Sequence, residues 1–377
     1  MNALIIGGGV IGLSIARELR LSGADGVTVV ESGKIGREAS WAAAGMLSPN
    51  VEMSPNAAFH EACRRSNELF PGFAARLLDE TGIDIELDRT GTIMLATNAD
   101  DLEHIDSRFA EQNAMGLPVH RISSRELRSL EPNLSEEALG GLFYNEDGQV
   151  ENRKMVSALA AFARQNNVTL IEGSQVDELL TEKNRVTGCR AGKRSYFSDV
   201  TIVTTGAWTS LIKIGDADFP VAVLPIKGQM LCFEPDGRLL DHIVCSPRGY
   251  VVPRKCETIL VGATVEDVGF QKNVTPGGIN ALRSAAEELV PVLKNEKVAT
   301  SWAGLRPFVA DGLPVIGKVR GAEGLFVATG HYRNGILLAP LTAKLVAEMV
   351  LDGIVDLASE IFSPDRLKDQ GRAAIQA

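Results

Sequence analysis

The sequence is poor in cysteine, and its cysteines follow no metal-binding or disulfide pattern. The 377 residues include five cysteines at scattered positions, never in C-x-x-C spacing, and five equally dispersed histidines. No group of them resembles a zinc site, and scattered, odd-numbered thiols are typical of reduced cysteines in the cytoplasm. We therefore expect no bound metal and a cytoplasmic location.

Long hydrophobic runs and blocks of positive charge are missing as well. No stretch reaches the roughly 18 apolar residues of a membrane helix, and the first residues lack the basic start of a signal peptide. The formal net charge is −10 without a Lys/Arg-rich segment, which argues against nucleic-acid binding. The chain is too long for one compact core and about right for two domains. The sequence leaves open whether the protein forms a homo-oligomer.

A glycine-rich turn between a strand and a helix lies near the start of the chain. A short apolar run is followed by Gly7, Gly9 and Gly12 in G-x-G-x-x-G spacing, then by a helical apolar stripe and a second strand ending at Glu31. In this order the glycines allow a tight turn, close approach of a pyrophosphate and tight helix packing, and Glu31 accepts hydrogen bonds from a ribose. This order predicts a dinucleotide site; a glycine turn in an ordinary βαβ unit is the alternative.

Small residues dominate the segment that follows, Ala39 to Met46. Such a segment lets backbone N–H groups approach an extended cofactor closely, which modestly favours FAD over NAD. An ordinary helix of small residues packed in a core is the alternative.

The same segment, 39–46, resembles the second flavin-contact segment of the D-amino-acid oxidase superfamily, most closely its glycine oxidase branch of thiamine biosynthesis. The resemblance covers residues 3 to about 365 and continues through a series of segments in the family's order, namely 203–208, 225–229, 250–254, 302–307, 311–317 and 330–340. An ordered series is far more specific than any one motif.

This resemblance implies non-covalent FAD, because no cysteine falls in the contact segments. The implied contacts are Val10, Ile11, Glu31, Ser32, Ala39, Ser40, Ala44, Gly45 and Met46, with Val176 on the adenine side and His331, Tyr332, Arg333, Asn334, Gly335, Ile336 and Leu337 on the isoalloxazine side.

The resemblance also implies substrate contacts at Arg306 and Arg333, with Tyr250 lining the pocket. A carboxylate in a closed pocket needs a cation, and the planar fork of arginine matches its two oxygens. The alternatives are a helix-terminal ion pair for Arg333, a salt bridge between domains for Arg306 and a half-buried aromatic for Tyr250. In one departure, Val265 stands where we expect a methionine near the flavin, which leaves the pocket size open.

The implied reaction is oxidation of glycine by hydride transfer to the flavin, giving an imine, then glyoxylate and ammonia, with O₂ reduced to hydrogen peroxide. Hydride transfer from a neutral amine needs no side-chain base, so no residue, His331 included, is assigned as catalytic. Lys227 is expected to be solvated. The alternatives are a sarcosine oxidase, a D-amino-acid oxidase or dehydrogenase with a larger pocket, or a flavin-binding protein with a regulatory role.

The order of these segments predicts an α/β fold with interleaved domains. We expect a doubly wound FAD-binding domain formed by residues 1–83, 147–222 and 306–365. Residues 84–146 and 223–305 are expected to form a substrate domain around an antiparallel sheet.

Overall fold

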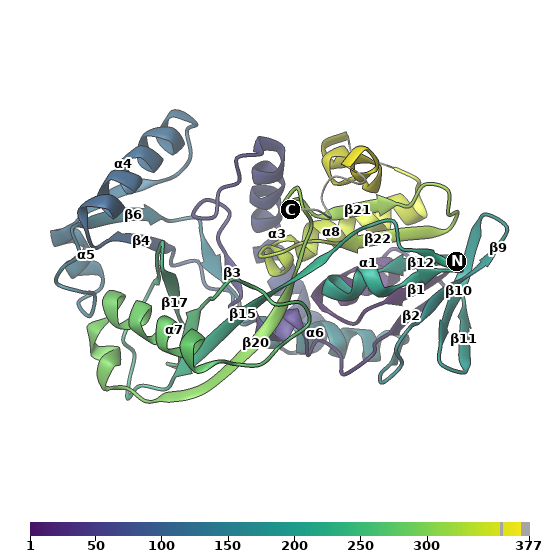
Figure 1. Ribbon diagram of the computed structural model, residues 1–377, viewed down its shortest axis with the longest axis horizontal. Helices are drawn as coiled ribbons and strands as arrows, with labels where there is room; N and C mark the ends of the chain where they lie inside the picture. The colour runs from purple at the N-terminus through teal and green to yellow at the C-terminus, as the bar shows by residue number, and fades with distance from the viewer. Residues whose placement is uncertain (355–356, 371–377) are drawn as a thin grey trace.

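The computed structural model describes residues 1–354 and 357–370 and contains two large sheets (Figure 1). The first has six strands in the order β21-β22-β12-β1-β2-β8, all parallel except β21. Its strands are β1 (Asn2–Ile6), β2 (Gly26–Val30), β8 (Val168–Ile171), β12 (Val200–Val203), β21 (Val315–Lys318) and β22 (Leu325–Thr329).

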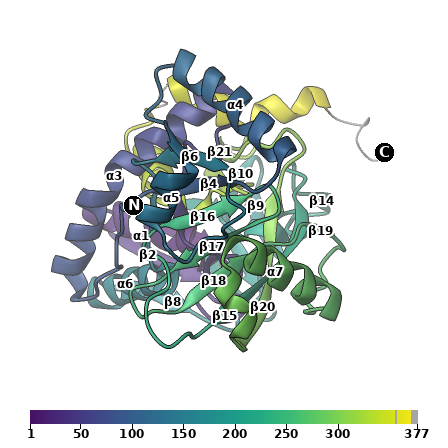
Figure 2. The ribbon, with the colours of Figure 1, turned by 90° about the vertical axis from the view of Figure 1, so that its left-hand side faces the viewer.

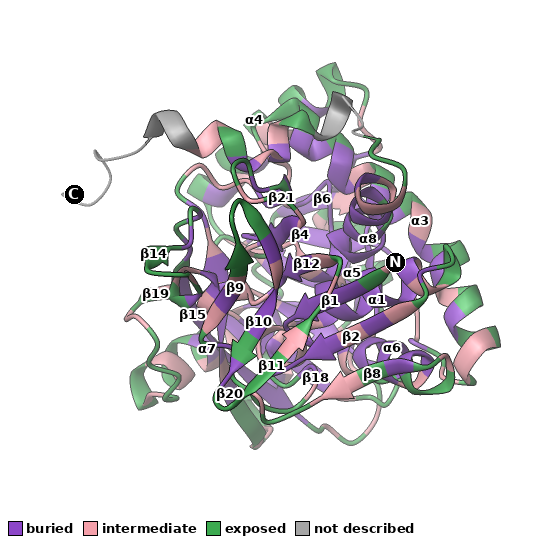
Figure 3. Ribbon diagram, turned by 90° about the vertical axis from the view of Figure 1, so that its right-hand side faces the viewer, coloured by how far each residue is buried: buried purple, intermediate pink, exposed green. Residues whose placement is uncertain are grey.

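Both faces of this sheet are covered, because successive side chains of a strand point to opposite faces. Ala3 and Ile5 join a core with four helices, whereas Leu4 and Ile6 join a core with a small sheet (Figure 3). The helices are α1 (Val10–Leu21), α3 (Ala57–Thr81), α6 (Asn152–Gln165) and α8 (Gly335–Leu351). The small sheet contains β9 (Glu178–Glu182), β10 (Arg185–Ala191), β11 (Arg194–Phe197), β13 (Lys213–Ile214) and β14 (Ala217–Asp218). The predicted α/β class is confirmed, with strands covering the face opposite the helices.

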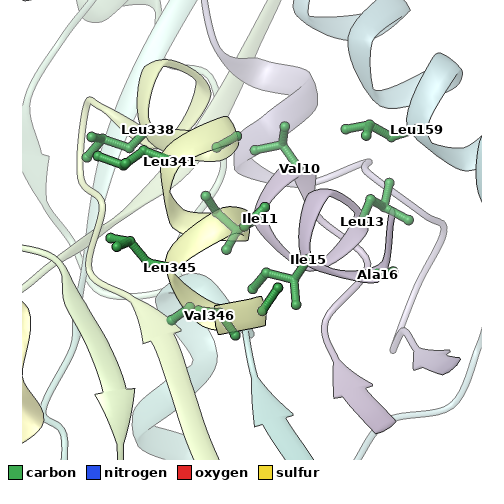
Figure 4. Close-up of a cluster of buried hydrophobic side chains, with 14 of the residues drawn as sticks. Val10, Ile11, Leu13, Ile15, Ala16, Leu159, Leu338, Leu341, Leu345 and Val346 are labelled. Atoms are coloured by element: carbon green, nitrogen blue, oxygen red, sulfur yellow. The ribbon is translucent and has the colours of Figure 1, made fainter. Parts of the chain in front are cut away.

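Helices α1 and α8 pack together, although more than 300 residues separate them in the sequence. Ile11 and Ile15 of α1 lie in one buried cluster with Leu341 and Leu345 of α8 (Figure 4). At Gly12, an added Cβ would come within 2.0 Å of the Gly7 carbonyl oxygen. The third glycine of the motif therefore lets α1 pack closely on the turn after β1.

The second large sheet lies on the left in Figure 1 and has nine strands. Their order is β19-β15-β18-β17-β16-β4-β6-β5, with β20 on the other side of β15. The strands are β4 (Thr92–Ala96), β5 (His120–Ser123), β6 (Gly140–Tyr144), β15 (Leu224–Phe233), β16 (Ile243–Ser246), β17 (Gly249–Pro253), β18 (Ile259–Gly262), β19 (Glu266–Asp267) and β20 (Val298–Phe308). They come from two separate parts of the chain, and we propose this sheet as the centre of the substrate domain.

The two faces of the nine-stranded sheet have different neighbours. Leu231 and Val251 face a core with α7 (Pro276–Leu289), which lies on the outer side together with α5 (Ser124–Leu130) (Figure 2). Met230 and Tyr250 point the other way, toward α2 (Ala39–Ala42) or α4 (Ala99–Ala114). The inner face thus carries side chains toward the first sheet. The remaining elements are β3 (Met46–Leu47), β7 (Gly148–Gln149), η1 (Gly206–Leu211), η2 (Pro291–Asn295), η3 (Leu357–Phe362) and η4 (Pro364–Gln370).

Candidate active site

A cavity of about 650 Å³ lies at the carboxyl ends of the parallel strands, where doubly wound folds bind ligands. It runs from the ends of β1 and β2 to the loop before α8. Many of the residues predicted to contact FAD line it, namely Gly7, Gly9, Val10, Ile11, Glu31, Ser32, Ala39, Ser40, Val176, His331, Tyr332, Arg333, Gly335 and Ile336. The glycine motif and the loop before α8 therefore meet in one elongated space.

The donors and acceptors of this cavity fit a dinucleotide. Glu31 Oε2 accepts from the Gly8 N–H at 2.8 Å and its Oε1 accepts from the Gly33 N–H at 2.8 Å, which fixes the carboxylate while leaving lone pairs for ribose hydroxyls. Helix α1 follows Gly9, which has no side chain to cap it, and the Val10 N–H donates to Ser40 Oγ at 2.9 Å. The next N–H groups of the first turn and the helix dipole remain available to a pyrophosphate in the cavity. The residues present thus fit FAD.

The small-residue segment 39–46 begins with the short helix α2 and then extends toward a second cavity. Asn152 Nδ2 donates to the Ser40 carbonyl at 2.8 Å, and Arg254 Nη2 donates to the Ala44 carbonyl at 2.7 Å. Arg254 and Asn152 are buried, so these contacts fix the segment between the two sheets. Sequence reasoning missed both roles, because each donor lies far from its acceptor along the chain.

The second cavity, of about 430 Å³, lies between the two sheets beside the first. It is lined by the remaining predicted contacts Ala44, Gly45, Met46, Asn334, Arg306 and Tyr250, and by Arg333 and Ile336, which also line the first cavity. Gly12 and Leu337 line neither. Leu337 is buried in the helical core, where its carbonyl accepts from Ser66 Oγ at 2.6 Å.

Arg306 and Tyr250 share one wall of the second cavity. Arg306, on β20, donates from Nη1 to the Thr264 carbonyl at 3.0 Å. An added Cβ at Gly228, on the neighbouring strand, would lie 2.4 Å from Arg306 Nη2, so only glycine leaves room for the guanidinium. Burial raises the pKa of Tyr250, while the nearby Arg306 acts in the opposite direction. A fixed guanidinium beside a neutral phenol is a donor set that suits a carboxylate.

Arg333 lies between β22 and α8 and already has an acidic neighbour. Its side chain is 44% exposed, and its Nη1 is 3.9 Å from Glu52 Oε1. The preceding residue, Tyr332, has a positive φ of 47°, which few residues other than glycine adopt outside functional sites. Arg333 therefore has an ion contact, as its alternative interpretation proposed, but the partner Glu52 also lines the second cavity. Sequence reasoning missed Glu52, since no motif surrounds this acid among the 48 of the chain.

Two lysines near the cavities form ion pairs. Lys227 is buried, and its Nζ is 2.8 Å from Glu266 Oε2, so the expectation of a solvated lysine was wrong; β19 covers this part of β15. Lys272 belongs to residues 268–273, which we call the rim loop. Its Nζ is 2.8 Å from Glu38 Oε2 at the edge of the first cavity.

His331 and Val265 mark the inner and outer ends of the site. Burial lowers the pKa of His331 to about 3, and its Nε2 lies 3.1 Å from Thr342 Oγ1. A neutral ring held by a hydroxyl supports leaving His331 out of proton transfer. Val265 is 53% exposed at the rim of the second cavity, where it fills little of the space.

Neither a metal centre nor a membrane helix is found in the part of the chain that the structure describes. There, no group of three or more His, Cys, Asp or Glu side chains is placed to hold a metal ion. No helix in that part is both long and apolar enough to cross a membrane.

Comparison with known proteins agrees with this geometry. The model of the FAD dependent oxidoreductase (DAO) family matches residues 2–349. A glycine oxidase of Pseudomonas aeruginosa is 34% identical over 93% of this chain and 94% of its own. The bifunctional protein ThiO/ThiG of Nostoc sp. is 35% identical over 98% of this chain, which spans only 55% of that protein.

A solved structure shares the architecture over almost its whole length. The crystal structure of glycine oxidase from Geobacillus kaustophilus superimposes with a TM-score of 0.90 at 33% identity, covering 96% of this chain and 97% of the other. FAD is thus the cofactor of this chain, and the first cavity has the lining that FAD requires. The chain belongs to the FAD dependent oxidoreductase family, and within it to the FAD-dependent amino acid oxidases.

Proposed function

We propose that the enzyme oxidises glycine at its α-carbon, with O₂ as the electron acceptor. The overall reaction converts glycine, O₂ and water into glyoxylate, ammonia and hydrogen peroxide. Bound FAD supplies the electron sink for the hydride, which no amino-acid side chain can accept. The observation that carries the proposal is the pairing of Arg306 with Tyr250 in a cavity that adjoins the cofactor cavity.

The residues of the second cavity have defined tasks in this proposal. Arg306 holds the substrate carboxylate through its planar fork, and Tyr250 donates its phenolic proton to the same group. Arg333 adds positive charge from the opposite wall. Helix α8 begins at Gly335 without a side-chain cap, and its first residues line the first cavity, so its positive end would stabilise negative charge on a flavin bound there.

The proposal is tested by adding glycine anaerobically to the purified yellow protein. Loss of the flavin absorbance, followed by peroxide release when O₂ is admitted, is the expected result. A flavin that stays oxidised in saturating glycine would rule the proposal out, and would favour the regulatory alternative if other amino acids also fail. Bleaching without peroxide, combined with reduction of added dyes, would indicate a dehydrogenase.

A larger substrate is the second candidate, and it rests on the size of the second cavity. Its volume of about 430 Å³ exceeds the needs of the five heavy atoms of glycine, and Val265 stands at its rim. Sarcosine or a D-amino acid would use this space. A panel of amino acids ranked by kcat/KM decides, because a D-amino acid that outpaces glycine severalfold would replace it as the substrate.

The resemblance to enzymes of thiamine biosynthesis further suggests that the imine product serves thiazole formation.

A further inference from the structure

Glu52 is the one carboxylate among the described residues that line the second cavity. It comes from the segment 48–53, between β3 and α3, which forms the wall facing Arg333. A cavity that holds an amino acid must receive two opposite charges. Arg306 accounts for the carboxylate, and nothing assigned so far receives the amino group.

The segment that carries Glu52 is fixed from both sides. Asp147 accepts hydrogen bonds from the N–H groups of Asn50 at 3.3 Å and Val51 at 3.0 Å. Arg108 Nη2 donates to the carbonyls of the same two residues, at 3.3 Å for Asn50, and Gln112 Nε2 donates to the Asn50 carbonyl at 2.9 Å. Glu52 is therefore held in place before any ligand arrives, as a binding residue requires.

The carboxylate of Glu52 lacks the hydrogen bonds that a partly buried carboxylate normally has. Within residues 1–354 and 357–370 it receives none, and its ion contact is the 3.9 Å approach of Arg333. Ser48 Oγ lines the same wall and also has no partner. Ser48 Oγ is buried, whereas the Glu52 side chain is 29% exposed at the cavity wall. Acceptors without partners at a cavity wall fit a ligand that brings N–H donors.

The charged and titratable groups around Glu52 come from several elements. They are Arg333 before α8, Arg306 on β20, Arg108 on α4, Tyr250 on β17, Cys245 on β16, Asp147 before β7 and Cys63 on α3. Burial raises the pKa of Glu52 although the three arginines act in the opposite direction. A carboxylate with a raised pKa is a better proton acceptor than one on the surface.

We infer that Glu52 binds the amino group of the substrate and accepts one of its protons, so that the amine is neutral when the α-carbon is oxidised. The inference rests on the proposed function. An ammonium presents three N–H donors to the Glu52 carboxylate while Arg306 holds the carboxylate end. In the transfer, one N–H bond breaks, its electron pair stays on nitrogen, and the proton forms an O–H bond on Glu52. Release of the product returns that proton to water.

The test compares Glu52→Gln with a matched control, Glu61→Gln, whose side chain on α3 is 59% exposed and pairs with Arg64. We expect E52Q to keep its flavin and to lose about 10- to 100-fold in kcat/KM for glycine at neutral pH, the range of a hydrogen bond to a charged group. Acetate, which lacks the amino group, should bind E52Q at least as tightly as the wild type, because the substitution removes a negative charge beside the carboxylate site. Glu52→Asp, which keeps the carboxylate, should recover part of the loss.

The pH profile separates this role from a structural one. The ratio of wild-type to E52Q kcat/KM should fall as the pH rises toward the pKa of the free amine, since neutral amine then arrives from solution. Burial raises the pKa of Asp147 to about 7 and Glu52 adds to this rise, so the ratio is compared above about pH 8, where Asp147 is ionised in both proteins. A constant ratio, or an equal loss of acetate and glycine binding, would overturn the amine role alone. A wild-type flavin that glycine leaves oxidised at every pH would overturn the proposed function and this inference together.

Discussion

Replacing Gly228 with alanine tests the carboxylate role of Arg306 without touching the arginine itself. The added Cβ would lie 2.4 to 2.5 Å from three atoms of the guanidinium, whereas ordinary contacts begin at 3.4 Å. The guanidinium must therefore shift by about 1 Å, and it can do so because it is the far end of a flexible side chain. A shift of that size lowers the rate of a positioned reaction by about 100-fold.

The magnitude follows from the hydrogen bonds that the shift disturbs. Losing one charge-assisted hydrogen bond to the substrate carboxylate is worth about 1.5–3 kcal/mol, or about 10- to 150-fold in kcat/KM for glycine. The midpoint of thermal unfolding should fall by no more than about 2–4 °C, since the fold itself loses about 1 kcal/mol or less.

The assay measures kcat/KM, bound flavin and thermal unfolding for G228A and for a control, Gly277→Ala. Gly277 lies in α7, and an added Cβ there has no atom within 4 Å, so the control should match the wild type in activity. A G228A enzyme with unchanged kcat/KM would refute the assignment of Arg306 as the carboxylate anchor. A G228A protein that loses its flavin would show that the strand pair β15–β20, rather than the guanidinium, takes up the strain.

Three further predictions concern the other walls of the site. Arg333→Ala should keep bound flavin and weaken glycine binding by about tenfold, because one of the cavity's cations is removed; unchanged affinity in a glycine titration would contradict this role. Lys272→Ala should speed FAD release, because the ion pair with Glu38 connects the rim loop to the edge of the cofactor cavity. The control is Lys34→Ala, which removes a similar surface ion pair with Glu172 and should leave the release rate unchanged in a flavin-fluorescence assay. Burial lowers the pKa of His331 to about 3, from 6.5 for the free group, so the stability that depends on its neutral ring is fully present above pH 6.5. As the pH falls from 6.5 toward 3, this contribution is lost by about 1.4 kcal/mol per pH unit. The difference in free energy of unfolding between wild type and His331→Asn should show this slope, and parallel curves would contradict it.

Local spacing made the cofactor side of the site predictable. Gly7, Gly9, Gly12 and Glu31 lie within one strand-helix-strand unit of about 30 residues. The hydrophobic pattern of this one segment is therefore enough to predict where they lie. The structure brings Glu31 to the end of β2, with its carboxylate toward the glycine turn, as the spacing predicts. The segment 39–46 needed the resemblance as well, because small residues alone fit a core helix equally well.

The substrate side depends on contacts that no local pattern encodes. Glu52 and Arg333 are brought together by the packing of α3 and α8 in one core. Lys227 is buried because β19 folds back over β15. In the sequence, Lys227 beside Gly228 has the features of an exposed turn. The burial and pairing of charged side chains at this site therefore follow from tertiary structure. The sequence prediction for Lys227 was wrong for this reason, and the role of Glu52 was missed.

The position of β1 between β2 and β12 has a consequence for how the protein is made. β1 gains its neighbour β12 only after residue 200 has been synthesised, and α1 gains its packing partner α8 only after residue 335. A nascent chain on the ribosome therefore holds an unfinished flavin site until α8 has emerged, although the glycine motif leaves the exit tunnel more than 300 residues earlier. Flavin capture should therefore follow the synthesis of α8, and pulse-labelled chains arrested before α8 should not retain FAD.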